Sequence, residues 1–356
     1  MTQMRILPWQ DIDEDWMSSA LSQAFDSPVQ VHNLSAEVIG TGKMGDNVRF
    51  RIDYAGDADT LPPTLVGKFP AEDPKAREMA GLQGAYYHEV MFYRHVAPRT
   101  SARVPRIYLN EIADTRTEFV TLMEDLAPAE PGSQFVPETQ ERARMALREA
   151  ARFTATFYGS QEFAGADYIM SQAAIDGGAM GQALLQQYWP SFADRFGANF
   201  SSEMRAVGDF FAGHYQRYIA SVPRAMSLVH GDLRSENLLF TDQYCVLVDW
   251  QTIAETSPLT DIAYFLGGSV TVEDRRAWER DLVAEFCEEL ARAGVRIEQE
   301  EAWRQYRLQS LHGLLIIILG ASFSSSDARS DEMFRLLIER QLQQAVDLDA
   351  IALVTA

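Results

Sequence analysis

The residues with the clearest chemical meaning lie in one short run, 228–240, which contains the pattern H-x-D-x-x-x-x-N. Asp232 supplies a carboxylate to this pattern and Asn237 an amide oxygen, and Asp249 follows twelve residues after Asn237. Phosphoryl transfer to an alcohol needs a carboxylate that accepts the hydroxyl proton and oxygen ligands that hold Mg²⁺. The spacing therefore predicts Asp232 as a catalytic base and Asn237 and Asp249 as metal ligands. The alternative interpretation is a polar turn followed by a core hairpin.

A lysine and a glutamate upstream form a second candidate set. Lys68 lies at the end of an apolar strand-like run, and Glu89 lies beside the apolar stripe of a helix-like stretch. Neither charge is stable among apolar neighbours without a partner. A strand lysine paired with a helix glutamate is the arrangement by which kinases hold the α- and β-phosphates. The alternative is a surface ion pair of little consequence, but the chain order of glycine loop, lysine and glutamate favours the phosphate site.

The glycine loop at residues 40–45 fits G-x-G-x-x-G. A dinucleotide-binding loop would be followed by a helix, whereas alternating apolar residues predict a strand at 48–54. A glycine loop between strands is instead typical of a flap over ATP phosphates, because glycine lets backbone N–H groups approach phosphate oxygens. A plain hairpin turn is the alternative. The expected nucleotide-binding residues of this loop are Gly40, Gly42, Lys43 and Gly45.

The elements that must position these residues fall into two regions. The first is a small β-rich region with a short helix at 13–25, and its further elements are strands at 48–54, 64–69 and 117–123 and a helix at 75–97. A connector rich in Pro, Gly and small residues follows at 128–137. Beyond it, helical periodicity predicts helices at 138–158, 201–220, 259–267, 273–293, 298–324 and 329–353. A β-hairpin at 237–248 is set among these helices and would carry Asn237 and Asp249 at its two ends.

The composition limits the class of protein. The chain has 356 residues, 47% of them hydrophobic, and its 31 Lys and Arg against 51 Asp and Glu give a formal net charge of −20. This length suits two lobes with a substantial core. The acidic balance, with no visible basic stripe, excludes nucleic-acid and anionic-membrane partners from our expectations.

Cysteine usage and hydropathy bear on the compartment. Cys245 and Cys287 are the only cysteines, so a disulfide framework is not expected, and the N-terminus lacks the pattern of a signal peptide. The most apolar run, 314–319, is far shorter than the roughly 20 residues that cross a bilayer, and it predicts a buried helix. We therefore expect a cytoplasmic protein, and the sequence leaves its oligomeric state open.

Together these motifs resemble the aminoglycoside phosphotransferase and choline kinase-like superfamily, whose members are relatives of protein kinases. The resemblance covers residues 36–270 and rests on His-Gly-Asp-Leu at 230–233, Asp-Trp-Gln at 249–251 and the segment 258–266. Within the superfamily, Asp-Trp-Gln and Glu-Asp-Leu at 124–126 are similar to the ecdysteroid kinase-like group. The resemblance implies a two-lobed α+β, protein-kinase-like fold, with a β-rich N-lobe at 1–126 and a larger helical C-lobe at 127–356.

The resemblance also implies roles for individual residues. Glu124 and Leu126 would belong to the inter-lobe hinge, whose backbone holds adenine. His230 would support the catalytic loop, and Asp261 is expected to cap its helix. Arg234 is either a partner of the γ-phosphate or a surface arginine.

The implied activity is ATP- and Mg²⁺-dependent transfer of the γ-phosphate to a hydroxyl of a small molecule. Residues 151–220 hold fourteen aromatic side chains, which could line a pocket for an apolar alcohol but serve mainly as helix-packing residues. Two alternatives stay open. One is an aminoglycoside-type antibiotic resistance kinase, and the other is a nucleotide-binding pseudokinase without turnover.

Overall fold

The computed structural model describes residues 4–40, 45–56, 59–171, 177–223, 226–323 and 327–354. The chain divides into two units, an N-terminal one and a C-terminal one. The N-terminal unit consists of Met1–Arg99, Val104–Pro128 and Asp249–Thr252. The C-terminal unit consists of Thr100–Arg103, Ala129–Val248 and Ile253–Ala356. These units differ from the contiguous ranges 1–126 and 127–356 at three places. Thr100–Arg103 belongs to the C-terminal unit, and Asp249–Thr252 and residues 127–128 belong to the N-terminal unit.

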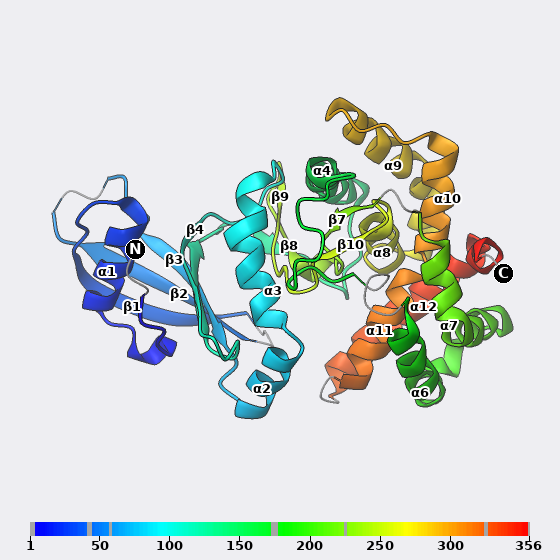
Figure 1. Ribbon diagram of the computed structural model, residues 1–356, viewed down its shortest axis with the longest axis horizontal. Helices are drawn as coiled ribbons and strands as arrows, with labels where there is room; N and C mark the ends of the chain where they lie inside the picture. The colour runs from blue at the N-terminus through cyan, green and yellow to red at the C-terminus, as the bar shows by residue number, and fades with distance from the viewer. Residues whose placement is uncertain are drawn as a thin grey trace. The chain divides into compact units, whose positions relative to one another are not determined.

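The N-terminal unit is built on a five-stranded antiparallel sheet with the strand order β1-β2-β3-β5-β4 (Figure 1). The strands are β1 (Val31–Ile39), β2 (Gly45–Tyr54), β3 (Thr64–Pro70), β4 (Ile107–Ile112) and β5 (Phe119–Glu124). Side chains alternate between the two faces of a strand. In β5, Val120 and Leu122 pack in the core shared with α1 (Glu14–Phe25), whereas Phe119 packs with Tyr86 of α3 (Ala85–Met91).

The expected strands and the first helix of this unit are present, with two differences from the expectation. Strand β4 was not expected. The glycine flap implied a strand before residue 40, but no residue range was predicted for it, because β1 is mostly exposed and its sequence carries no apolar alternation. The expected helix at 75–97 is divided into α2 (Pro74–Leu82), α3, a π-helical turn (Phe92–Val96) and a 3-10 turn (Ala97–Arg99). The first break falls at Gly84, whose φ of 74° is left-handed and favours glycine.

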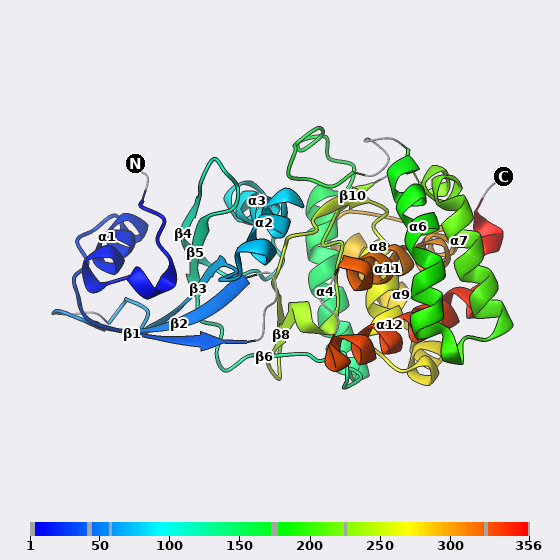
Figure 2. The same ribbon diagram turned by 90° about the horizontal axis from the view of Figure 1, so that it is seen from below.

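The C-terminal unit is mainly helical (Figure 2). Its helices are α4 (Gln140–Phe157), α6 (Ala179–Phe196), α7 (Ser202–Ser221), α8 (Thr260–Gly268), α9 (Val272–Arg292), α10 (Gln299–Gln309), α11 (His312–Phe323) and α12 (Ala328–Asp347). Its short strands are β6 (Glu130–Pro131), β7 (Ser227–Val229), β8 (Leu238–Phe240), β9 (Cys245–Leu247) and β10 (Ala254–Thr256). The expected hairpin is confirmed as β8 paired with β9, whereas α6 was not expected and the helix expected at 298–324 is divided into α10 and α11.

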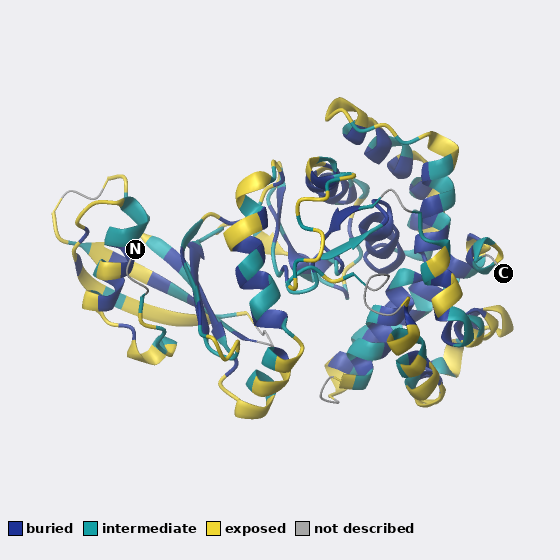
Figure 3. Ribbon diagram, in the orientation of Figure 1, coloured by how far each residue is buried: buried dark blue, intermediate teal, exposed yellow. Residues whose placement is uncertain are grey.

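The core of this unit lies among α6, α7, α11 and α12. The apolar run at 314–319 is a buried helix, as expected: Leu314, Leu315, Ile317 and Ile318 of α11 are all buried. Gln299–Phe323 is by length and composition apolar enough to cross a membrane, but most of its apolar window is buried. Most of the aromatic residues of α6 and α7 also belong to this core. Figure 3 shows α8 buried along its length, consistent with the burial of all nine of its residues.

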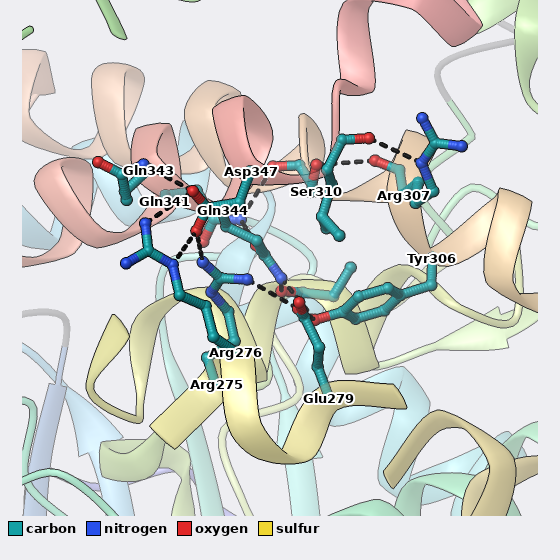
Figure 4. Close-up of polar contacts among 12 residues, drawn as sticks. Arg275, Arg276, Glu279, Tyr306, Arg307, Ser310, Gln341, Gln343, Gln344 and Asp347 are labelled. Atoms are coloured by element: carbon teal, nitrogen blue, oxygen red, sulfur yellow. Dashed lines mark hydrogen bonds and ion pairs between the residues drawn. The ribbon is translucent and has the colours of Figure 1, made fainter. Parts of the chain in front are cut away.

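A buried network of hydrogen bonds and ion pairs connects α9, α10 and α12 with α8 (Figure 4). Arg275 of α9 donates to Glu279 at 2.8 Å and also pairs with Asp347 of α12. The Tyr306 hydroxyl of α10 donates to Glu279 at 2.7 Å. Gln344 of α12 donates both to the Tyr306 hydroxyl and to the backbone carbonyl of Ala263 in α8. Because every partner lies on a different turn or helix, the network fixes the register of α8 against α9, α10 and α12.

Candidate active site

Lys68 is the centre of a charged cluster in the N-terminal unit. It lies in β3, between β2 and β5, opposite Asn47 and Thr121. Its Nζ atom is 2.6 Å from Oε2 of Glu89 in α3 and 3.0 Å from Oδ1 of Asp249. Lys68 is 9% exposed and Glu89 is 2% exposed, so this pair is buried rather than a surface ion pair.

The titration behaviour of the cluster follows from its burial. Burial opposes the charge of Lys68, but the carboxylates of Asp249 and Glu89 outweigh it and raise the lysine pKa. Burial raises the pKa of Glu89, and the positive charge of Lys68 works against that shift. Lys68 is therefore held as a cation, which suits a residue that binds phosphate oxygens.

The segment that carries Asp249 is anchored in the same unit by its neighbours. The Trp250 ring is fully buried and stacks on Phe92, with ring centroids 3.9 Å apart and an interplanar angle of 7°. The side-chain nitrogen of Gln251 donates to Glu89 at 3.4 Å. Asp249 itself has a φ of 66°, a left-handed conformation that is uncommon outside glycine and often found at functional sites.

The loop predicted to be catalytic, which we call the catalytic loop, lies in the C-terminal unit and joins Asp232 to Asn237. The side-chain nitrogen of Asn237 donates to the backbone carbonyl of Asp232 at 2.8 Å and to its Oδ2 atom at 3.0 Å. Because both contacts use the side-chain nitrogen of Asn237, its Oδ1 atom stays available to bind a cation. The loop begins at Gly231, whose φ of 84° requires a residue that tolerates the left-handed region.

Two buried residues, His230 and Asp261, stabilise the loop through hydrogen bonds. His230 is completely buried, and its Nε2 atom lies 2.9 Å from the carbonyl oxygen of Val248, just before Asp249. Asp261 of α8 accepts the backbone N–H groups of His230 at 2.7 Å and of Gly231 at 2.9 Å, one on each carboxylate oxygen. Burial raises the pKa of Asp261, and these hydrogen bonds work against the shift.

Asp261 is the supporting residue whose role the sequence prediction missed. We expected it to cap its own helix, but the residue at the N-cap position of α8 is Leu259, without a side-chain cap. Asp261 binds the catalytic loop thirty residues earlier in the chain instead. The sequence shows the distance along the chain between Asp261 and the loop. It does not show the hydrogen bonds of Asp261 to His230 and Gly231, because these depend on tertiary packing.

Of the remaining expected nucleotide-binding residues, Gly40, Gly45 and Glu124 lie at the ends of strands of the sheet. Gly40 follows β1 with a φ of 75°, and Gly45 begins β2, where an added Cβ would lie 2.6 Å from the carbonyl oxygen of Phe69. Gly42 and Lys43 lie outside the described residues. Glu124 ends β5, and its Oε1 atom accepts the backbone N–H of Arg106 at 3.0 Å.

The segment after β5, which contains Leu126, is stabilised by an ion pair. Arg49 of β2 makes two hydrogen bonds with Asp125, at 2.7 and 3.0 Å. Leu126 itself is half-buried. Bidentate pairs of this kind restrain the backbone around them.

Comparison with known proteins gives a match to one family model and several similar solved structures. Residues 52–308 match the sequence model of the phosphotransferase enzyme family. No curated protein matches the chain significantly. The chain resembles choline kinase from Cryptosporidium parvum Iowa II at 12% identity, with a TM-score of 0.57 over 98% of this chain and 94% of that one.

Two further solved structures have the same fold. A microcompartment-associated aminopropanol kinase is 17% identical, with a TM-score of 0.53 over 96% of this chain and 100% of that one. The GDP complex of a variant aminoglycoside 2′-phosphotransferase-IIIa is 13% identical, with a TM-score of 0.51 over 94% of this chain and 98% of that one. The two-lobed α+β, kinase-like fold that we expected is therefore confirmed.

Proposed function

Because the chain belongs to the phosphotransferase enzyme family, we propose that it transfers the γ-phosphate of ATP to a hydroxyl group of a small molecule, in a reaction that depends on Mg²⁺. The observation that carries this proposal is the catalytic loop, in which Asp232 and Asn237 are joined by two hydrogen bonds. The loop is also held on two backbone N–H groups by the buried Asp261. This support suits a base whose position must not change during the reaction.

Asp232 is the residue that we assign as the base. Its carboxylate accepts the proton of the acceptor hydroxyl as the acceptor oxygen bonds to phosphorus and the bond from phosphorus to the nucleoside diphosphate breaks. Lys68 binds the α- and β-phosphates, and Glu89 orients it, as the 2.6 Å contact between them supports. All of these side chains are chemically intact, which argues for turnover rather than for a pseudokinase.

Asn237 and Asp249 are the residues that would hold Mg²⁺. Both offer hard oxygen donors, which Mg²⁺ prefers. The Asn237 amide is already oriented by Asp232, and the Asp249 side chain is 38% exposed beside Lys68, so both residues fit a cation. Bound Mg²⁺ would neutralise phosphate charge. Among the described residues no group of three or more His, Cys, Asp or Glu forms another metal site.

The glycine loop and the hinge complete the proposed nucleotide site. The left-handed conformation of Gly40 and the tight contact at Gly45 support a glycine flap over the phosphates. We assign Gly42 and Lys43 to the same flap from the sequence alone. Glu124 and Leu126 contribute the hinge backbone that holds adenine, next to the Arg49–Asp125 pair.

The acceptor is a small-molecule alcohol, as the names of the choline and aminopropanol kinases support. The neighbouring aminoglycoside phosphotransferase keeps an antibiotic resistance kinase open as the second candidate. The proposal also includes three expectations from the sequence. The chain belongs to the ecdysteroid kinase-like subgroup, it is located in the cytoplasm, and it has no nucleic-acid or membrane partner.

A screen of ATP consumption tests this proposal. The full-length protein is incubated with ATP and Mg²⁺ and a panel of apolar alcohols, amino alcohols and aminoglycosides, with the Asp232→Asn protein as the matched control. We expect at least one acceptor to raise ATP consumption in the wild type alone. Nucleotide binding in a thermal-shift assay without turnover on any acceptor would contradict the proposal and identify a pseudokinase. Turnover confined to aminoglycosides would favour the resistance kinase.

A further inference from the structure

Arg234 is held between two carboxylates of the catalytic loop. Its Nε atom donates to Oδ2 of Asp232 at 3.3 Å, and its Nη1 atom donates to Oε2 of Glu236 at 2.6 Å. The same Nη1 atom lies 3.8 Å from the sulfur of Met333 in α12, and the Arg234 side chain is 22% exposed. Arg234 is thus neither a simple surface arginine nor placed to reach a phosphate without breaking these contacts.

The single positive charge of this group is shared between two negative charges. Asp232 and Glu236 are two carboxylates, and Arg234 is the cation that contacts both. A guanidinium group that already pairs with two carboxylates stabilises the negative charge of a third group only weakly. The guanidinium therefore acts on its neighbours in the loop.

The two oxygens of the Asp232 carboxylate have different surroundings. Oδ2 accepts hydrogen bonds from Arg234 and from the side-chain nitrogen of Asn237. Oδ1 is buried, and the Tyr264 side chain of α8 approaches this carboxylate. Burial, and then the charge of Asp232 and a hydrogen bond with it, raise the pKa of Tyr264 well above its usual value. Rotation of the carboxylate would break both hydrogen bonds to Oδ2 at once.

We propose that Arg234 is a positioning residue that fixes the plane of the Asp232 carboxylate and so holds the base in one orientation for the acceptor hydroxyl. This inference rests on the proposed function. Without Arg234 the Oδ2 atom would lose one of the two hydrogen bonds that it accepts from Arg234 and Asn237, and misplacement of a base by about 1 Å can cost about 10²-fold in rate. Glu236 and Met333 of α12 contact the Nη1 atom of the guanidinium, so Arg234 connects the base to both of them.

Kinetics of Arg234 variants provide the first test, with ATP and Mg²⁺ and the best acceptor from the screen, or water if no acceptor is active. We expect Arg234→Met to lower kcat by about 10–100-fold with KM for ATP changed by less than about 3-fold. Arg234→Lys should lose less, and about 50 mM guanidinium should restore part of the kcat of Arg234→Gly, because only the cationic donor is missing. Arg292→Met, at an exposed position of α9, is the control and should behave as the wild type.

Two kinetic results would overturn the proposal. One is an Arg234→Met kcat within about 2-fold of the wild type. The other is a rise in KM for ATP with kcat unchanged, which would assign Arg234 to nucleotide binding.

A second test does not depend on enzymatic activity. Urea unfolding of Arg234→Met, Asp232→Ala and the double variant measures the coupling between the two side chains. Arg234→Met should raise the equilibrium constant for unfolding in both backgrounds. We expect the factor of increase to be at least about 3-fold larger in the wild type than in the Asp232→Ala protein. If the wild type shows no turnover with any acceptor, the proposed function fails, and this cycle alone decides the positioning role. Equal effects of Arg234→Met in the two backgrounds would refute it.

Discussion

Replacing Lys68 by methionine should destabilise the N-terminal unit by about 3–5 kcal/mol, because the change leaves a buried carboxylate without its nearest cation. The structure supports a value in this range. Nζ of Lys68 and Oε2 of Glu89 are 2.6 Å apart and their side chains are 11% and 3% exposed. At an effective dielectric constant of about 20, this separation corresponds to about 6 kcal/mol of attraction. Protonation of the released Glu89 recovers part of that loss.

The loss of stability should also depend on pH. Burial raises the pKa of Glu89 above its ordinary 4.5, and Lys68 is the cation that opposes this shift. A carboxyl whose pKa is higher in the folded state stabilises the fold below its unfolded pKa and loses that contribution as pH rises through its folded pKa. Without Lys68, stability should therefore fall as pH rises above 4.5. In the Lys68→Met/Glu89→Leu double variant this pH dependence should vanish and most of the lost stability should return.

Urea unfolding followed by circular dichroism at pH 5 and pH 8 measures these differences. Lys75→Met is the matched control, because Lys75 is an exposed lysine of the same unit. The reasoning is refuted if Lys68→Met is within about 1 kcal/mol of the wild type at both pH values, well below the cost of an uncompensated buried charge. It is also refuted if the double variant is no more stable than the single one.

Three further predictions concern the C-terminal unit. Arg275→Met should lower the unfolding free energy by about 3 kcal/mol in urea titrations, because it leaves Glu279 buried without its cation, and an unchanged value would contradict this. Asp261→Asn should cost about 1–3 kcal/mol in the same assay, because its amide nitrogen cannot accept one of the two backbone N–H groups of the catalytic loop. Burial raises the pKa of the Cys245 thiol strongly and that of Cys287 to about 11, so both should resist a thiol reagent at pH 8 and react after unfolding. Labelling of either cysteine in the folded protein at the rate of a small thiol would count against this.

The sequence was sufficient for the elements whose patterns are local. The apolar alternation of Val48, Phe50 and Ile52 identified β2, and all three side chains are buried. The hairpin of β8 and β9 was identified from two short apolar runs with a polar turn between them. Strand β1 lacked such a signal because most of its residues are exposed at the edge of the sheet. The break before α3 could have been expected from Gly84.

The candidate site residues also differ in how far their contacts could be predicted from local sequence. Lys68 and Glu89 were paired from their residue types and their order in the chain, and the 2.6 Å contact confirms that pairing. The contact of Asp249 with Lys68 spans 181 positions, and that of Arg234 with Met333 spans 99. No local pattern encodes contacts of this length, because they arise only when separate elements pack together. The sequence therefore predicted the Lys68–Glu89 contact but not these long-range contacts.

The most direct test of the central claim is the rate of phosphoryl transfer by the Asp232→Asn protein to the acceptor found in the screen, measured with radiolabelled ATP. Asparagine keeps the shape of the side chain and an oxygen for Arg234 and Asn237, but it cannot take up the hydroxyl proton. We predict a fall in kcat of at least about 10³-fold, with binding of ATP unchanged in thermal-shift titrations. Transfer at the wild-type rate by the Asp232→Asn protein would contradict the assignment of Asp232 as the base.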